Sequence, residues 1–281
     1  MKTLIVTADD FGADAKVNEA VEIGHRDGIL TATSLMVGGA AAADAIERAR
    51  RLPALGVGLH VNLAEGRPIL PAEAIPGLVG RNGLFRTDMA RLGAAIFFNR
   101  RVRRQAAAEI DAQFAAFAAT GLALDHVNAH KHFHLHPTIA ALIIDIGKHY
   151  GMAAARAAIE PARTLRAVEP TTLAIAALGA APLARHLRRR LLRAGVSSPD
   201  HVFGVTWSGA MTPARVRGIA AHLPPGVTEI YLHPATANRF AGSARGYRYT
   251  EELAALTDPS VLETVRSAGV VLARFADLPR P

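Results

Sequence analysis

The histidine-rich segment of this chain reads His126-Val-Asn-Ala-His-Lys-His-Phe-His-Leu-His-Pro137 and holds five of the 12 histidines within eleven positions. Residues 125–128 lie between apolar stretches and are predicted as a buried strand, whereas Pro137 is predicted to open a helix. If the extended conformation continues, His126, Asn128 and His130 share one face, because strand side chains alternate. A histidine-rich tract indicates metal binding. A polar surface loop is the alternative, and an expression tag is excluded because the tract is internal.

Length and composition point to one large soluble domain. The chain has 281 residues, half of them hydrophobic, so a single domain over residues 1–281 is expected. The absence of cysteine excludes disulfides, thiolate zinc sites and cysteine nucleophiles, and it assigns any metal to His, Asp and Glu. The first apolar run is too short for a signal peptide and no run reaches membrane-spanning length, so a cytoplasmic protein is expected.

The chain alternates short β-rich runs with helical patterns. This alternation predicts a parallel sheet with helices outside it, and seven or eight units favour a distorted, TIM-like parallel β/α barrel over an open doubly wound sheet. Residues 62–87 are rich in Gly and Pro and are expected to form a long excursion that lines a site. The predicted strands are 4–8, 34–37, 57–61, 125–128, 153–157, 202–206, 229–232 and 270–275, and the predicted helices are 14–26, 40–52, 88–120, 137–147, 170–194, 212–222 and 250–268.

Polar residues stand at the ends of several predicted strands. Asp9 and Asp10 follow the first strand, and His60, His130 and His233 lie at the ends of later ones. The C-terminal ends of barrel strands form one rim, where active sites are built, so these five side chains are expected to converge. Taken singly, each has an ordinary explanation as a helix cap, a core histidine or a turn residue.

These residue types fit a hydrolytic centre. One carboxylate and two imidazoles hold a divalent cation and leave positions open for water and substrate. Adjacent residues on an extended strand point in opposite directions, so a turn must aim one aspartate at the metal and the other at its water as a general base. With His233 placed to protonate the leaving group, the set predicts hydrolysis of an amide or an ester.

Four motifs resemble the YdjC-like carbohydrate deacetylases, and their spacing covers nearly the whole chain. They are Thr7-Ala-Asp-Asp-Phe-Gly12, Gly58-Leu-His-Val61, Asn128-Ala-His-Lys-His-Phe-His-Leu-His-Pro137 and Leu232-His-Pro-Ala235. The resemblance implies a distorted β/α barrel, a divalent metal and removal of an N-acetyl group from an amino sugar. The histidine tract is most similar to members associated with hopanoid biosynthesis, which implies N-acetylglucosamine attached to a hopanoid lipid.

The resemblance also implies roles for the residues at the rim. Asp10, His60 and His130 correspond to the family's metal ligands, and Asp9 is then the base and His233 the acid. Related NodB-type deacetylases use a His-x-x-x-His pair, which here is His130 and His134, so His134 is the alternative to the favoured His60. The family's metal is described as magnesium, whereas two imidazoles suit zinc better, and the choice between Mg and Zn stays open.

Other polar residues near predicted strand ends are expected to support the site. The expected sugar contacts are Asn62, His134, Arg156, Glu160 and Trp207, and the residues expected to support the metal ligands from behind are His126, Asn128 and Glu229.

Charge and apolar patterning favour contact with an anionic membrane. The formal charge of +8 suits nucleic acid, anionic lipid or acidic small molecules, but aromatic residues are only 5% and no nucleic-acid motif is present, so no nucleic acid is expected. Leu92–Phe98 runs into Arg100–Arg104, and Leu173–Leu178 precedes the arginine-rich residues 182–193. Such stretches suit interfacial helices, and a buried helix with a basic end is the alternative.

The residues alone leave other functions open. A metal-dependent phosphodiesterase, a sugar isomerase and a non-catalytic metal- or lipid-binding barrel fit the same scaffold. A homodimer is also left open.

Overall fold

The sheet at the centre of the molecule is parallel and is organised around its first strand. The structure, a computed structural model, describes residues 2–170 and 175–281, and within them the strands are β1 (Lys2–Phe11), β2 (Ala32–Leu35), β3 (Gly56–Val61), β4 (Val127–Ala129), β5 (His201–Phe203), β6 (Gly226–Leu232) and β7 (Val270–Leu272). β1 pairs with β6 along most of its length, with β7 at its start and with β2 at its end. Leu4, Ile5, Val6 and Ala8 are fully buried, as expected for a parallel strand covered on both faces.

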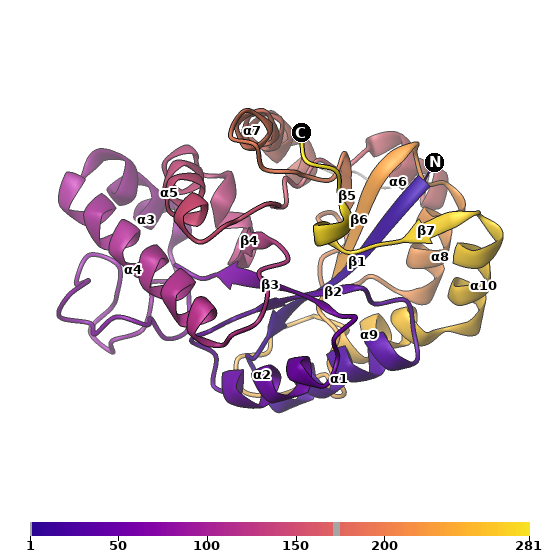
Figure 1. The fold of residues 1–281 in the computed structure, drawn as a ribbon, viewed down its shortest axis with the longest axis horizontal. Helices are drawn as coiled ribbons and strands as arrows, with labels where there is room; N and C mark the ends of the chain where they lie inside the picture. The colour runs from indigo at the N-terminus through magenta and orange to yellow at the C-terminus, as the bar shows by residue number, and fades with distance from the viewer. Residues whose placement is uncertain (1, 171–174) are drawn as a thin grey trace.

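The regular sheet follows the order β4-β3-β2-β1-β6-β5 and curls on itself (Figure 1). Residues 153–159 lie between its two outer strands and bridge them irregularly. Arg156 N donates to Val127 O at 3.1 Å, and Val202 N donates to Ile159 O at 2.8 Å. The strand predicted at 153–157 is therefore reduced to isolated bridges, which is where the barrel is distorted. The predicted single-domain, distorted parallel β/α barrel is confirmed.

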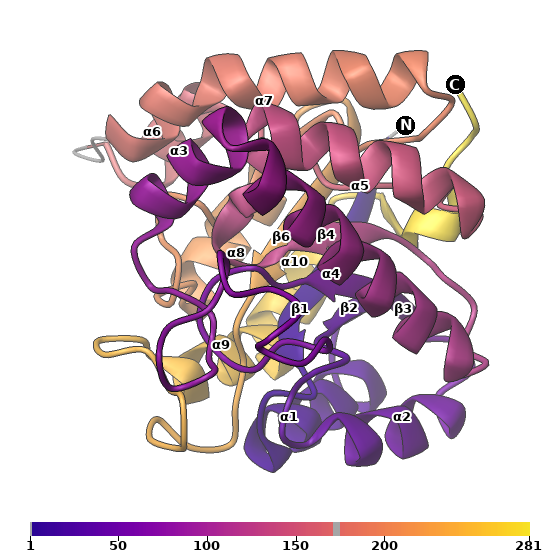
Figure 2. The same cartoon turned by 90° about the vertical axis from the view of Figure 1, so that its left-hand side faces the viewer.

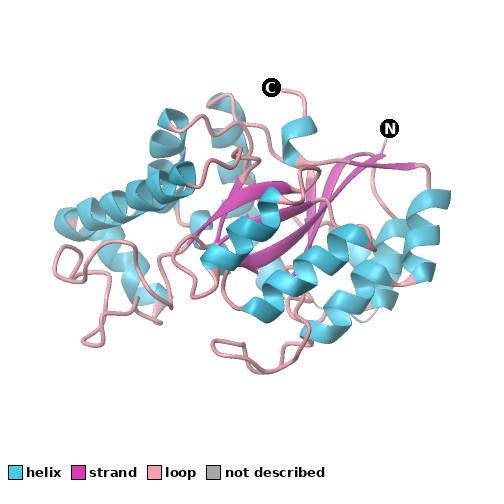
Figure 3. Cartoon of the chain, turned by 60° about the horizontal axis from the view of Figure 1, so that its bottom comes forward, coloured by secondary structure: helices cyan, strands magenta, loops and turns pink. Residues whose placement is uncertain are grey.

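Helices surround the strands, as Figure 3 shows in cyan around magenta. Figure 2 shows α7 along one edge of the molecule, beside α5, with α4 crossing below them. The helices of the described residues are α1 (Ala15–Arg26), α2 (Ala42–Arg50), α3 (Met89–Phe98), α4 (Arg100–Ala119), α5 (Pro137–His149), α6 (Ala162–Val168), α7 (Ile175–Arg193), α8 (Pro213–Ala221), α9 (Tyr249–Thr257) and α10 (Pro259–Ser267), with short 3-10 turns η1 (His130–Leu135) and η2 (Phe275–Asp277).

Two predicted helices are each broken in two by a capping residue. The helix predicted over 88–120 ends at Phe98 and restarts at Arg100, because the Asn99 side chain accepts the first backbone N–H groups of α4. The helix predicted over 250–268 breaks in the same way at Asp258, which caps α10 and is followed by Pro259.

Strand boundaries also differ from the prediction. β5 ends at Phe203 and not at 206, because the Glu160 carboxylate accepts the backbone N–H groups of residues 204–206 in place of a neighbouring strand. β2 begins at Ala32, two residues before the predicted start, and β4 ends at Ala129, so that His130 already belongs to η1. The excursion over 62–87 is confirmed, and Val79–Phe85 is an isolated bridge within it.

Candidate active site

Three side chains from three strand ends converge on one point. Asp10 stands at the end of β1, His60 near the end of β3, and His130 directly after β4. Asp10 Oδ1 lies 3.3 Å from His60 Nε2 and 3.1 Å from His130 Nδ1. One ligand atom from each residue lies within 4.8 Å of the other two, and within the described part of the chain this is the group of His and acidic residues that could hold a metal ion.

The backbone at the end of β1 separates the two adjacent aspartates. Asp10 adopts the left-handed conformation with φ of 65°, and the pairing with β2 shifts register between Ala8 and Phe11. A non-glycine residue in this conformation is uncommon and costs backbone energy, so it is typical of functional sites. Because of this turn, Asp10 faces the two histidines while Asp9 reaches a different set of partners.

Asn128 fixes the orientation of the His60 ring. Asn128 Oδ1 lies 2.6 Å from His60 Nδ1, so that nitrogen carries a proton. Nε2 faces Asp10 Oδ1, to which it donates when the ring is charged, and it is free to bind a metal when the ring is neutral. The amide nitrogen of Asn128 donates to Ser34 Oγ at 2.8 Å and to Asp9 Oδ1 at 3.1 Å. Asn128 thus links His60 to Ser34 and Asp9.

The charges within the triad stabilise its ionised form in the absence of a metal. Burial alone would raise the pKa of Asp10, but the charges and hydrogen bonds of His130 and His60 lower it well below its usual range. Burial alone would lower the pKa of His60, but Asp9, Asp10 and Asn128 raise it. Asp10 and the two histidines therefore attract one another strongly. A bound cation would replace this attraction between the carboxylate and the imidazoles.

Asp9 lies beneath the triad in a cluster of hydrogen-bond donors. Arg156 NH1 donates to its Oδ2 at 2.6 Å and NH2 to its Oδ1 at 3.0 Å, while Ser34 Oγ donates to Oδ1 at 3.1 Å. Burial alone would raise the pKa of Asp9, but Arg156, His60 and His233 lower it well below its usual range. Arg156 also donates to Glu229 Oε1 at 2.7 and 3.0 Å, so one fully buried guanidinium holds two carboxylates.

The triad forms part of the wall of a cavity of about 280 Å³. Asp9, His233 and Asn62 line the same cavity, so the five residues predicted for the rim do converge. The loops that follow β2, β3 and β6 close it, and they include residues 36–40, 62–69 and 240–242. The polar groups occupy one part of the wall, and the apolar part is formed by Val17, Met36, Val37, Ile69 and Phe240.

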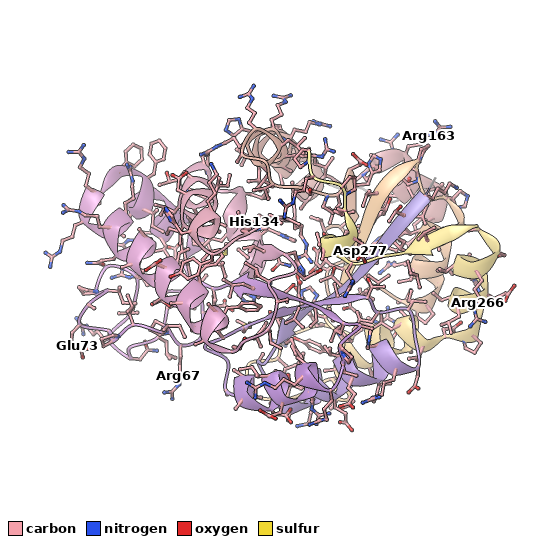
Figure 4. The ribbon with its side chains drawn as sticks, viewed as in Figure 1. Arg67, Glu73, His134, Arg163, Arg266 and Asp277 are labelled. Atoms are coloured by element: carbon pink, nitrogen blue, oxygen red, sulfur yellow. The ribbon has the colours of Figure 1, made fainter. Side chains whose placement is uncertain are left out.

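Several residues predicted to contact the sugar lie elsewhere. Arg156 lies behind Asp9, and Glu160 caps the backbone after β5. The Trp207 side chain is 5% exposed. The Arg215 guanidinium lies over it, 5.0 Å from the centre of the Trp207 ring. His134 is buried between Asn128, Arg156 and α5, and Figure 4 shows it in the interior of the molecule, apart from Arg67 at the lower edge. The positions of these four residues suit a structural role in the barrel interior.

His134 does not join the metal triad. The ring nitrogens of His134 have no hydrogen-bond partner among the described residues, and the group that could hold a metal contains His60 in its place. His126 also lies inward, where its Nε2 meets Ser34 Oγ at 2.9 Å and its ring stacks on Phe275. Glu229 supports Asp9 indirectly, through Arg156.

Some residues of the site were missed by the sequence reasoning. Ser34 donates to Asp9 from β2, and Gln113 reaches the cavity wall from α4, where it pairs with both backbone groups of Asn62. Ser34 could have been found, because it lies in a strand next to β1. Gln113 gave no signal, because it is one polar residue within a long amphipathic helix.

Comparison with known proteins places the chain in a family. A family model described as YdjC-like protein matches residues 3–267. The chain belongs to the YdjC-like family. One similar protein is a carbohydrate deacetylase of Geobacillus stearothermophilus, 30% identical over 278 residues, which are 97% of this chain and 96% of that protein. A carbohydrate deacetylase of Vibrio vulnificus (strain YJ016) is 40% identical over 153 residues, or 52% of this chain and 56% of that protein.

The fold of this family member also resembles a solved structure. A protein of Enterococcus faecalis V583, provisionally described as a cellobiose-phosphate cleavage protein, superposes with a TM-score of 0.76 at 24% identity and covers 98% of this chain and 97% of its own. This likeness supports the fold. Among the described helices, none combines the length and the apolar character needed to cross a membrane.

Proposed function

We propose that this protein is a metal-dependent carbohydrate deacetylase that removes the N-acetyl group from an amino sugar. The observation that carries the proposal is the convergence of Asp10, His60 and His130 with Asp9 and His233 around one cavity. The carbohydrate deacetylases among its relatives support the substrate class.

The donor set fits one divalent cation. Asp10 would supply a carboxylate oxygen, His60 its Nε2 and His130 its Nδ1, and Asn128 already sets the tautomer that frees His60 Nε2. Two imidazoles and one carboxylate suit Zn²⁺ better than Mg²⁺, which prefers oxygen ligands and bound waters. A cation bound there would polarise the acetyl carbonyl and lower the pKa of water.

Two residues of the chain would move the protons. Asp9 would accept a proton from the attacking water, and Arg156, Ser34 and Asn128 keep its carboxylate ionised and correctly oriented. His233 would donate a proton to the sugar nitrogen as the C–N bond breaks, which yields acetate and the free amine. Asn62, on the cavity wall, would contact the sugar.

Mass spectrometry tests this function directly. N-Acetylglucosamine conjugates are incubated with the protein in Zn²⁺ or Mg²⁺, and loss of one acetyl group with release of acetate is expected. Intact conjugates with both metals, under conditions in which elemental analysis shows one bound ion, would refute the proposal. Cleavage of a phosphodiester substrate, or isomerisation of the sugar, would replace it with the phosphodiesterase or the isomerase function.

The finer part of the proposal concerns the carrier of the sugar. We infer that the N-acetylglucosamine is attached to a hopanoid lipid, which the resemblance of the histidine tract favours. The apolar part of the cavity wall, with Val17, Met36 and Phe240, supports an apolar group next to the sugar. A faster turnover of the lipid-linked sugar than of the free sugar at equal concentration is the expected result.

Contact with an anionic membrane is proposed at the junction of α3 and α4. Phe98 is 81% exposed and Phe97 46% exposed, and their rings touch edge to face. Residues 89–108 carry five arginines and no acidic residue. An exposed aromatic pair beside arginines suits the surface of an anionic bilayer.

The second predicted membrane stretch is less suited to that role. The start of this stretch, at Leu173 and Ala174, lies outside the described residues. Leu187 and Leu191 on α7 are buried, and Arg188 pairs with Asp200, so this helix matches the alternative of a buried helix with a basic end.

Vesicle flotation separates these possibilities. Phe97→Ser/Phe98→Ser should lose binding to vesicles of anionic lipid at low salt, while Val271→Ser/Leu272→Ser, which removes two other exposed apolar side chains on β7, should float like the wild type. Equal flotation of the two double variants would refute the site. If the phenylalanine variant instead abolishes a dimer in sedimentation, a second copy of the chain occupies this surface.

A further inference from the structure

A buried glutamate lies directly behind the proposed acid, His233. Glu252 belongs to α9 and follows His233 by 19 residues in the chain, and its side chain is fully buried. Fully buried carboxylates are rare unless they are paired. The burial of the Glu252 carboxylate therefore needs a specific explanation.

The carboxylate of Glu252 joins the loop before α8 to His233, which lines the cavity. Its Oε1 accepts the backbone N–H of Met211 at 2.8 Å, and its Oε2 accepts the backbone N–H of His233. The same Oε2 lies 3.8 Å from Nδ1 of the His233 ring. Burial raises the pKa of Glu252 above its usual range, and the nearby His233 charge and the two N–H donors offset this only in part.

Two tyrosine rings contact the His233 ring. Its centre lies 5.7 Å from the ring of Tyr231 and 5.2 Å from that of Tyr247. Both tyrosines are fixed in turn, because Tyr231 Oη pairs with His132 Nε2 at 2.8 Å and Tyr247 Oη with Ser208 Oγ at 2.9 Å.

The buried edge of this ring points at the glutamate. His233 Nδ1 is buried and has no hydrogen-bond partner within residues 2–170 and 175–281, while the residue as a whole lines the cavity. The distance of 3.8 Å to Glu252 Oε2 is too long for a hydrogen bond, but catalytic hydrogen bonds are often long before substrate binds and shorten in the complex.

We propose that Glu252 is a positioning residue that accepts the Nδ1 hydrogen of His233 and so keeps Nε2 directed into the cavity as the proton donor. The role of His233 as an acid rests on the proposed deacetylase function. In the step itself, the Nε2 proton passes to the sugar nitrogen as the C–N bond breaks, and the neutral ring keeps its remaining proton on Nδ1, facing Glu252. Nε2 then regains a proton from solvent.

A purely structural role is the competing explanation, because Glu252 also joins two loops through backbone N–H groups. Glu252→Gln separates the two roles. The amide keeps the size of the side chain but removes the charge. The matched control is Glu160→Gln, which removes a partly buried carboxylate that joins backbone N–H groups after β5 without touching His233.

The first measurement is ¹⁵N NMR of histidine-labelled protein, with the His233 signal identified by its absence in His233→Gln. In the wild type at a pH where the ring is neutral, His233 should carry its proton on Nδ1, and Glu252→Gln should shift the population toward Nε2. A wild-type ring protonated on Nε2, or identical tautomers in wild type and Glu252→Gln, would overturn the proposal. This measurement needs no substrate, and a wild-type ring protonated on Nε2 overturns the proposal even if Glu252→Gln folds poorly.

The second measurement compares two substrates in the metal-loaded enzyme. Glu252→Gln should reduce kcat on the acetylated amino sugar by about 10²–10⁴-fold, the range found when a carboxylate that orients a functional histidine is lost, and it should recover on an activated acetyl ester whose leaving group needs no acid. Glu160→Gln should change both rates by the same factor. Equal losses of Glu252→Gln on the two substrates would overturn the positioning role. A shifted tautomer in a protein without deacetylase activity would leave the positioning inference standing and refute the proposed function instead.

Discussion

The rim of the barrel and the interior below it contain histidines from the same short tract, but these histidines have opposite surroundings. At the rim, His130 Nδ1 meets Asp10 at 3.1 Å and the ring lines the cavity. In the interior, His134 is buried without a hydrogen-bond partner among the described residues, and burial together with the Arg156 charge lowers its pKa to about 3. The backbone between them makes the difference.

The tract changes direction immediately after His130. Lys131 and His132 adopt left-handed conformations with φ of 52° and 54°, so the strand does not continue and His134 is carried inward. Spacing along the sequence therefore does not decide which histidines can share a metal. The comparison teaches that the backbone turn selects one ligand from a tract of five histidines.

The largest effect is expected at the rim. Replacement of Asp10, His60 or His130 by Ala should each abolish tight binding of one divalent ion and, with it, deacetylation, because three ligands are the minimum for such a site. His134→Ala should keep the ion. Elemental analysis of the four purified variants checks this, and unchanged metal content in all three rim variants would show that the ligand set is wrong. A larger loss in His134→Ala than in His60→Ala would favour the His-x-x-x-His pair.

The next effect separates the base from the acid. Asp9→Asn keeps the size of the side chain but removes its basicity, so it should retain the metal and lose about 10²–10⁴-fold in rate. His233→Ala should lose a similar factor on the amide and recover much of its rate on an activated acetyl ester, because that leaving group needs little protonation. Asp9→Asn should not recover. Rescue of both variants, or of neither, would contradict the assignment of the two roles.

The third prediction concerns Arg156, which links the rim of the barrel to its interior. Arg156→Met leaves the carboxylates of Asp9 and Glu229 buried without their shared cation, which should destabilise the fold by about 3–5 kcal/mol. Urea unfolding at pH 7.5 measures this. The control is Arg188→Met, whose guanidinium forms a partly exposed pair with Asp200 and should cost only about 0–1 kcal/mol. Equal losses in the two variants would show that the buried cluster does not stabilise the barrel.

The rim could be predicted from sequence because it depends on regular structure. Asp10, His60 and His233 lie at or next to the ends of buried parallel strands, and such ends meet at one edge of a barrel. Asn128 could be predicted for a related reason, since it shares a strand face that alternation defines. The barrel itself followed from the repeated strand–helix order.

The interior could not be predicted, because it depends on irregular backbone. Residues 153–159 form isolated bridges, and that irregular course places Arg156 behind Asp9 and not at the sugar. Trp207 follows a strand that ends early, after Glu160 has taken its backbone N–H groups. Glu252 belongs to a surface helix and gave no signal, since its burial depends on how α9 packs against the loop after β6.

The smallest effect tests the interior histidine through the pH dependence of stability. His134 has a pKa of about 3 in the fold against 6.5 in an unfolded chain. The folded state keeps it neutral, whereas the unfolded chain takes up a proton below pH 6.5. His134 therefore does not lower the free energy of unfolding above pH 6.5. As the pH falls toward 3, this free energy decreases by about 1.4 kcal/mol per pH unit, and the loss at pH 5 is about 2 kcal/mol in total.

His134→Leu removes this titration from a site whose neighbours include the apolar Ile143, Leu187 and Leu191 as well as Asn128 and Arg156. At pH 7.5 the variant should be as stable as the wild type or more stable, because two buried nitrogens without partners are removed. Between pH 7.5 and 5 its free energy of unfolding should fall by about 2 kcal/mol less than that of the wild type. Urea titrations at the two pH values measure both quantities. Parallel losses in the two proteins would mean that the His134 ring finds a proton acceptor or ordered water inside the barrel, and the contrast between interior and rim histidines would then fail at this residue.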